Sequence, residues 1–229
     1  MPWRQWIRGT EVEPSLYAAD FASLGAQIQQ LLDAGARIFH FDVGDGCFVE
    51  PITMGPIVLA SIAPMIHRAG GTIDCHLMVV EPERHFAQVA RAGGDSVTFH
   101  VEASEDPAGT AARARALGLG VGIAFKLETS VEAALTAADG VDLVNVMSIH
   151  PGYSGQRFMP ETLPRISALR EALPEATLVQ VDGGIDRTNI DTVRDAGANL
   201  LVAGTSVFGQ ADITAAYRAL AGESVGAAT

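Results

Sequence analysis

The chain has 229 residues, 48% of them hydrophobic and 18% charged, so it can bury one sizeable core and is not expected to be disordered. Its formal net charge of −12 disfavours nucleic acids and anionic membranes as partners. The two cysteines, Cys47 and Cys75, are too few for a disulfide framework, and neither a secretory signal nor an apolar run long enough to span a membrane is present, so we expect a cytoplasmic protein.

Short strand-like runs alternate along the chain with segments whose apolar residues recur at helical spacing. The expected strands are 14–17, 38–43, 72–79, 96–102, 120–126, 143–149, 177–181 and 199–203. The expected helices include 21–34, 82–92, 108–117, 131–138, 161–172, 188–196 and 212–220. Glycine directly follows alanine after several of these helices, as at Ala34-Gly35 and Ala92-Gly93, which is typical of a helix stop before the next strand.

Eight strands alternating with eight helices indicate a parallel sheet with helical crossovers, and at this length a closed (β/α)8 TIM barrel fits better than an open doubly wound sheet. No G-x-G-x-x-G follows the first strand, which argues against a dinucleotide-binding fold. We expect an N-terminal extension over 1–12, one barrel domain over 13–222 and a tail over 223–229. In such a barrel the chemistry belongs at the C-terminal ends of the strands.

The run H-F-D-V-G-D-G at 40–46 places a histidine and two acids in an otherwise apolar strand. Because side chains alternate along a strand, His40 and Asp42 point to the same face. His76 shares a face with Met78 at the end of the next strand, and Asp182 closes the seventh.

A lone strand histidine is more often a hydrogen-bonded core residue, and a lone aspartate more often a helix cap or a turn residue, which is how we interpret Asp45 and Asp186. Four such groups at one barrel mouth are harder to explain in that way, because two buried carboxylates without a partner would each cost several kcal/mol. The sequence therefore predicts a site for one divalent metal ion, such as Zn, Mn or Fe.

Three glycine-bearing stretches follow the sixth, seventh and eighth strands, at 151–156, 182–185 and 203–206. Glycine lets backbone N–H groups approach an anion closely, and barrels commonly bind phosphate with the loops after the last two strands. One such loop could be a plain turn, but three adjacent loops favour a phosphate site.

With these residues assembled, the chain resembles the ribulose-phosphate 3-epimerase family from about Glu13 to Gly222. The resemblance rests on the order and spacing of P-S-L-Y-A-A-D-F (14–21), H-F-D-V-G-D-G-C-F-V (40–49), D-C-H-L-M-V (74–79), T-F-H-V-E-A (98–103), V-M-S-I-H-P-G-Y-S-G-Q-R-F (146–158), V-D-G-G-I (181–185) and V-A-G-T-S-V-F (202–208). It implies a metal-dependent barrel enzyme that inverts C3 of a phosphorylated ketose, most often interconverting D-ribulose 5-phosphate and D-xylulose 5-phosphate. It also implies a homo-oligomer.

The matching motifs imply that His40, Asp42, His76 and Asp182 are the metal ligands. They also imply that Asp42 and Asp182 form a catalytic acid/base pair, one on each face of an enediolate. The implied substrate-binding residues are Ser15, His76, Met78, Met147, Gly152, Gly155, Gly183, Gly184, Gly204 and Thr205. We expect the loop 47–55 to be a lid, and His100 to reach the residues behind the metal ligands.

The chain departs from the family pattern near the expected mouth, where Gly44 replaces a methionine, Glu50-Pro51 replaces Pro-Asn, Lys126-Leu127 replaces Asn-Pro and His150 replaces an asparagine. We expect Gly44 to enlarge the pocket. Lys126 is expected either to add a cation near the substrate or to form a surface ion pair.

These departures leave alternatives open for the function. One is a 3-epimerase of another ketose phosphate, such as allulose 6-phosphate or a tetrulose phosphate. A sugar-phosphate lyase or decarboxylase is disfavoured because residues 42–47, D-V-G-D-G-C, lack the lysine of the Asp-x-Lys-x-x-Asp signature. A non-catalytic sugar-phosphate-binding protein is disfavoured because binding alone does not need two opposed carboxylates.

Overall fold

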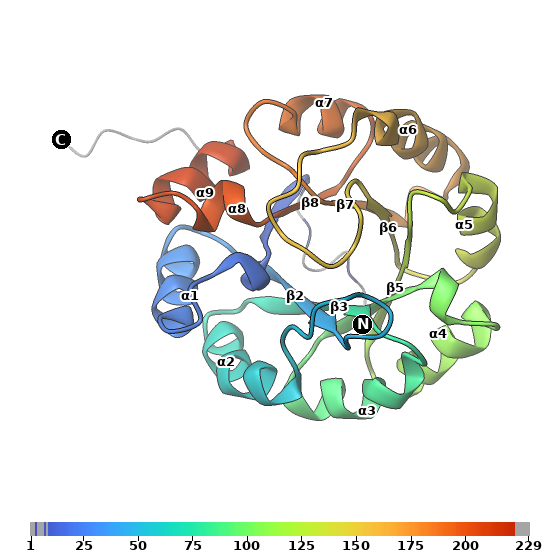
Figure 1. Cartoon of the computed structure of the whole chain (residues 1–229), viewed down its shortest axis with the longest axis horizontal. Coiled ribbons are helices and arrows are strands. Elements are labelled where there is room, and N and C mark those ends of the chain that lie inside the picture. Colours follow the sequence, from blue (N-terminus) through green and yellow to red (C-terminus); the bar gives the residue numbers. More distant parts are fainter. Residues whose placement is uncertain (1–2, 4–6, 8, 223–229) are drawn as a thin grey trace.

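The computed structural model describes residue 3, residue 7 and residues 9–222. In this part of the chain, eight parallel strands form a ring with the helices around its outside (Figure 1). The strands are β1 (Glu11–Pro14), β2 (Ile38–Gly44), β3 (Thr72–Met78), β4 (Ser96–His100), β5 (Gly120–Phe125), β6 (Leu143–Met147), β7 (Leu178–Asp182) and β8 (Leu200–Ala203). The predicted (β/α)8 TIM barrel is confirmed.

The described helices lie between the strands, with short 3-10 turns at η2 (Leu16–Ala18), η3 (Val101–Ala103) and η4 (Pro160–Thr162). They are α1 (Leu24–Asp33), α2 (Pro56–Arg68), α3 (Glu83–Ala92), α4 (Pro107–Ala116), α5 (Val131–Ala137), α6 (Leu163–Ala172), α7 (Ile190–Asp195), α8 (Thr205–Phe208) and α9 (Ile213–Ala221). The side chains of Asp106, Ser130 and Asp212 accept hydrogen bonds from first-turn amides and so cap α4, α5 and α9. The sequence assigned no bounds to α2 or α8.

The first strand departs most from the predicted elements. We predicted it at 14–17, but β1 ends at Pro14 and the chain then enters η2, so that prediction is wrong. Glu11 and Glu13 interrupt the apolar pattern of this strand. Val12 packs in the hydrophobic core, whereas Glu13 is fully buried among polar side chains. An alternating strand with a carboxylate on its buried face does not read as apolar.

The sheet runs in the order β1-β8-β7-β6-β5-β4-β3-β2, with every neighbouring pair parallel. The ring closes between β1 and β2 at a single parallel bridge, in which Ser15 pairs with His40. This closure brings the residue that follows β1 beside the polar side chains of β2.

The two faces of the barrel strands differ in polarity. Phe39, Phe41 and Val43 of β2 pack in the hydrophobic core that includes the helices. The alternate residues His40 and Asp42 are also buried but carry polar groups. The polar side chains that will form the site therefore lie inside the barrel, at the C-terminal half of the strands.

The N-terminal end of the barrel is closed by Trp3, which is 1% exposed. Its ring packs in a cluster with Ile38, Leu143, Leu178 and Leu200, near the starts of four strands. Trp6 and the predicted tail 223–229 lie outside the described residues. The domain boundaries at 12/13 and 222/223 stay predictions.

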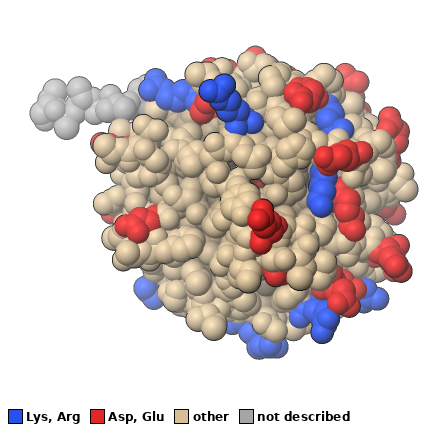
Figure 2. Space-filling model, viewed as in Figure 1, with Lys and Arg blue, Asp and Glu red and all other residues tan. Residues whose placement is uncertain are grey.

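The surface of the mouth side is unevenly charged. In Figure 2 most lysine, arginine, aspartate and glutamate side chains gather toward the right-hand side and the lower edge, whereas the centre and left carry few.

No helix within residues 9–222 is both long enough and apolar enough to cross a membrane.

Candidate active site

Four side chains predicted from the sequence meet inside the barrel mouth. His40 Nε2 lies 3.3 Å from Asp42 Oδ1 and 3.6 Å from Asp182 Oδ2. His76 Nδ1 lies 3.3 Å from Asp42 Oδ1 and 3.2 Å from Asp182 Oδ2. The two ring nitrogens are themselves 3.3 Å apart. One atom from each residue therefore faces a common point, and all four atoms lie within 4.8 Å of one another.

The electrostatics of this cluster favour a cation. Burial disfavours charge on each group, yet Asp42 and Asp182 hold the pKa of His40 well above its ordinary value and raise that of His76. The same imidazoles hold the pKa of both aspartates below the usual range. Among the described residues, no lysine or arginine pairs with either carboxylate.

The donor set fits a divalent metal ion. Two imidazole nitrogens and two carboxylate oxygens are ligands that Zn, Mn and Fe share. Within the described part of the chain, the positive charge nearest to the aspartates in the absence of a metal is a proton on His40 or His76. A bound cation would compensate both carboxylates and leave the imidazole lone pairs as ligands.

A second buried layer lies on the inner side of His40. Its Nδ1 is 3.4 Å from Asp74 Oδ2 and 3.6 Å from Glu13 Oε2. Gln180 Nε2 donates to both carboxylates, at 2.6 Å to Glu13 and 3.0 Å to Asp74. Burial raises the pKa of Glu13 to about 7, whereas His40 and Gln180 keep the pKa of Asp74 below its ordinary value despite burial. These two carboxylates lie beside Nδ1 without a hydrogen bond to it, while Nε2 of the same ring faces the mouth.

A cavity of about 1080 Å³ opens from Asp42 and Asp182 across the mouth. Its lining includes nearly all predicted substrate-binding residues, namely Ser15, Met78, Met147, Gly152, Gly155, Gly183, Gly184, Gly204 and Thr205. His76 is absent from the lining because it is fully buried behind the aspartates. The Ser15 hydroxyl donates to Asp42 Oδ2 at 2.7 Å, which orients that carboxylate.

Other lining residues were not singled out from the sequence. Tyr17, Ser154 and Phe158 lie within the matching stretches, so their position there was an available signal. Arg187 lies just beyond the V-D-G-G-I stretch and gave no signal.

The turn after β7 requires its two glycines. Gly184 has φ 66°, and a Cβ there would lie 2.2 Å from the Phe158 backbone nitrogen. Gly183 has φ 126°, and its carbonyl accepts a 2.7 Å hydrogen bond from the Ser148 hydroxyl. The loops after β6 and β7 therefore pack backbone to backbone directly above Asp182.

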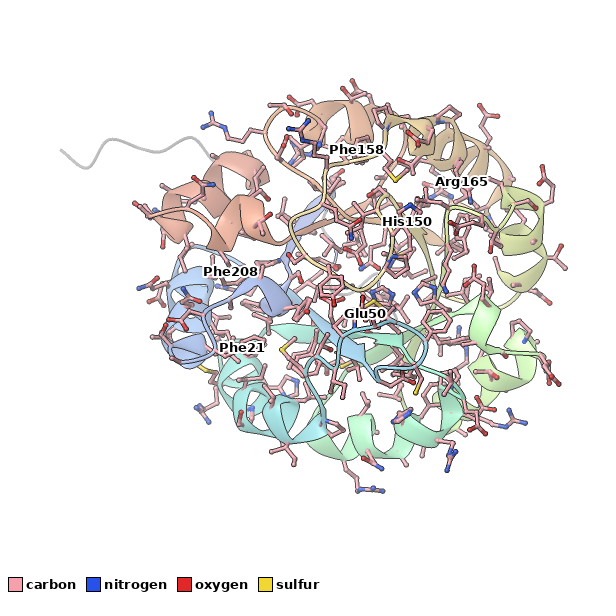
Figure 3. All side chains as sticks on the ribbon, viewed as in Figure 1. Phe21, Glu50, His150, Phe158, Arg165 and Phe208 are labelled. Atoms are coloured by element: carbon pink, nitrogen blue, oxygen red, sulfur yellow. The ribbon has the colours of Figure 1, made fainter. Side chains whose placement is uncertain are left out.

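The loop after β2 folds across the mouth and meets the loop after β6. In Figure 1 both loops cross the centre of the ring, and Figure 3 places Glu50 and His150 there. The Asp45 carboxylate anchors the loop by accepting from the amides of Cys47, Phe48 and Val80. A Cβ on Gly152 would lie 3.3 Å from the Pro51 ring, so the two loops are in close contact.

Gly44 has a different role from the predicted one. It does not line the cavity, and a Cβ at this position would lie 2.8 Å from the Pro51 carbonyl oxygen and 3.0 Å from Val49 Cγ2. The prediction that Gly44 enlarges the pocket is therefore wrong. The space left by the missing side chain is filled by the loop itself, which can fold down over the mouth because residue 44 is a glycine.

Lys126 takes neither of its two predicted roles. Its ammonium sits 3.9 Å from the centroid of the Phe48 ring, a cation–π contact, and it does not line the cavity. His150 is also outside the cavity lining and lies 3.6 Å from Glu128. Slight burial and the nearby Glu50 carboxylate raise the pKa of the Tyr153 phenol, which places Glu50 at the junction of the two loops.

The substitution Gly44→Ala is expected to lift the loop from the mouth, because overpacking of this kind costs about 1–3 kcal/mol. We expect KM for the substrate to rise about tenfold and amide hydrogen exchange over 47–53 to speed up. Gly25→Ala in α1 is the control, since its Cβ would meet only Met65 Sδ at 3.9 Å. An unchanged KM together with unchanged exchange would show that Gly44 does not hold the loop down.

Comparisons with known proteins identify relatives over most of the chain. Residues 11–208 match the family described as Ribulose-phosphate 3 epimerase family. A ribulose-phosphate 3-epimerase of Schizosaccharomyces pombe is 43% identical over 198 residues, covering 86% of each chain. That of Mycobacterium tuberculosis is 39% identical over 215 residues, covering 93% of this chain and 92% of the relative. A 3-hexulose-6-phosphate synthase of Salmonella typhimurium shares the fold, with TM-score 0.72, 14% identity and coverage of 93% and 98%.

Proposed function

This chain belongs to the ribulose-phosphate 3-epimerase family, and from that premise we propose that it inverts C3 of D-ribulose 5-phosphate to give D-xylulose 5-phosphate, and the reverse. The observation that carries the proposal is a pair of carboxylates, the buried Asp42 and the half-buried Asp182, beside two buried imidazoles at the floor of one cavity. The chemistry needs this arrangement, because inversion requires an acid/base group on each face of a planar carbon.

In the proposed reaction, one aspartate removes the C3 proton and the other returns a proton from the opposite face. Asp42 lies near the C-terminal end of β2 and Asp182 ends β7, so their side chains enter the cavity from separate parts of the ring. Because their pKa values lie below the usual range, both carboxylates are ionised at neutral pH. Which of the two acts as the base depends on the direction of the reaction.

His40, Asp42, His76 and Asp182 would hold one divalent metal ion, of which Zn, Mn and Fe suit the donors. When bound, such an ion would stabilise the negative charge that develops on the substrate oxygens as the C3 proton leaves. Ser15 orients Asp42 by its hydrogen bond, and the buried Met78 and Met147 present an apolar surface at the reacting carbons. The folded loop after β2 would exclude water.

The glycine-rich loops after β6, β7 and β8 would bind the phosphate. Gly155, Gly183, Gly184, Gly204 and Thr205 all line the cavity, and their backbones can approach an anion without side-chain obstruction. Arg157 and Arg187 also line it and add positive charge in an otherwise acidic protein. Gripping the remote phosphate lets binding energy assist the reaction at C3.

The residues that line the cavity also bear on which ketose phosphate is the substrate. Gly44, Glu50, Lys126 and His150 are the departures that suggested another substrate, yet none of them lines the cavity. This supports ribulose 5-phosphate over allulose 6-phosphate or a tetrulose phosphate.

The test is to measure kcat/KM for ribulose 5-phosphate, allulose 6-phosphate and a tetrulose phosphate side by side. Ribulose 5-phosphate is expected to be preferred by at least tenfold. A preference for either of the others would contradict the substrate assignment, while leaving the epimerase chemistry in place.

We also propose that the enzyme is cytoplasmic and that it forms a homo-oligomer. Cys47 and Cys75 are both free thiols, which suits a reducing cytoplasm. Phe21, just before α1, and Ile57, in α2, are 52% and 89% exposed, and apolar surface of this kind is commonly buried between subunits of a homo-oligomer.

A further inference from the structure

A line of hydrogen bonds continues behind His76, on the side away from the aspartates. His76 Nε2 lies 2.9 Å from His100 Nε2, and His100 Nδ1 lies 3.2 Å from Glu102 Oε2. Both histidines are fully buried, and the side chain of Glu102 is 23% exposed. The line therefore joins the floor of the active site to a carboxylate close to the surface.

The orientation of the Glu102 carboxylate is fixed from its other side. Its Oε1 accepts a 2.8 Å hydrogen bond from the Lys126 amide and another from the Thr129 hydroxyl. The 3-10 turn η3, which follows β4 directly, brings Glu102 back beside His100. Oε2 is thus left to face the imidazole.

The carboxylate at one end of this line determines which nitrogen of each histidine donates a hydrogen bond and which accepts one. A carboxylate can only accept, so His100 donates from Nδ1 and its Nε2 carries a lone pair. That lone pair requires His76 to donate from Nε2. The remaining nitrogen of His76, Nδ1, then presents its own lone pair toward Asp42 and Asp182.

We propose that Glu102 and His100 are positioning residues that fix His76 in the tautomer able to ligate a metal ion through Nδ1. The inference rests on the metal site proposed above. Such outer carboxylate–histidine partners orient metal ligands and raise their basicity. The Phe48 ring packs 4.8 Å from the His100 ring, centroid to centroid, and the Lys126 ammonium covers Phe48 in turn, so the folded loop shields the line from water.

The substitution Glu102→Gln keeps the size of the side chain but reverses the donor and acceptor roles along the line of hydrogen bonds. The amide oxygen is expected to stay with the Lys126 N–H, which leaves the NH₂ group facing His100. His100 must then accept at Nδ1 and donate from Nε2, and His76 must accept at Nε2 and carry its proton on Nδ1, toward the metal site.

The experiment measures the affinity for Mn²⁺ or Zn²⁺ by competition with a chromophoric chelator. Affinity in Glu102→Gln is expected to fall 10–100-fold. The kcat of this variant is expected to recover as the metal concentration is raised, which a merely structural defect would not allow. Glu105→Gln, an exposed glutamate three residues further on, is the control and is expected to match the wild type.

A double-mutant cycle gives a second readout. If both residues act through one line, His100→Phe combined with Glu102→Gln binds metal no more weakly than His100→Phe alone. Wild-type affinity in Glu102→Gln, additive losses, or a kcat that metal does not restore would overturn the inference. Binding that His76→Ala abolishes but Glu102→Gln leaves unchanged would overturn this inference alone. Absence of binding by the wild type would overturn the proposed metal site as well.

Discussion

Replacing Asp182 with asparagine is expected to lower turnover by about 10³–10⁴-fold while the barrel still folds and binds phosphate. The magnitude is that of losing one acid/base group. Asparagine keeps the size of the side chain and its hydrogen-bonding oxygen but cannot accept the C3 proton. Because Asp182 is 14% exposed at the end of β7, outside the apolar core, the fold should tolerate the change. The measurement is kcat with circular dichroism and melting temperature as folding controls.

The variant Asp42→Asn is the matched partner in this experiment. Each variant would retain the acid/base group on one face only, so neither should epimerise faster than this residual rate, but each should still exchange the C3 proton of one epimer with solvent. The two variants should therefore exchange opposite epimers. Appreciable epimerisation by Asp182→Asn would refute the two-aspartate mechanism.

Removing divalent metal with a chelator is expected to abolish activity. Zn, Mn and Fe are then added back separately, and at least one of them is expected to restore activity. Loss of the cation leaves the carboxylates of Asp42 and Asp182 to be compensated, among the described residues, by protons on His40 and His76. The melting temperature should also fall, since a ligand present at 1,000 times its Kd stabilises a fold by about 4 kcal/mol.

The control for metal removal compares two histidines. His76→Ala should lose bound metal, as measured by elemental analysis of dialysed protein, whereas His67→Ala should retain it. His67 pairs with Asp95 at 2.9 Å on the surface and lies outside the cluster. Full activity of a preparation shown to be free of metal would contradict the proposed cofactor.

The inward-facing residues of β2 and β3 were predictable because strand alternation is a local property. His40 and Asp42 were assigned to one face from a spacing of two, and His76 and Asp182 from their places near strand ends. The barrel followed from the number and order of elements, which short-range patterns also report. Local signals therefore located the four residues that meet at the mouth.

What the sequence did not predict depends on contacts between distant segments. Gln180 bonds Glu13 across 167 positions, and the clash that requires glycine at residue 44 comes from Pro51 and Val49 in the folded loop. No periodicity reports either contact. Glu13 also explains why β1 was predicted at the wrong residues, since a carboxylate buried inside a barrel breaks the apolar pattern by which strands are found.

The central claim is most directly tested by proton NMR of the metal-loaded protein in D₂O with D-ribulose 5-phosphate. The account predicts that deuterium enters at C3 as D-xylulose 5-phosphate forms, and that wild type and Glu105→Gln behave alike. Product that forms without deuterium at C3, or no exchange at C3 with any of the three ketose phosphates, would contradict proton transfer by Asp42 and Asp182.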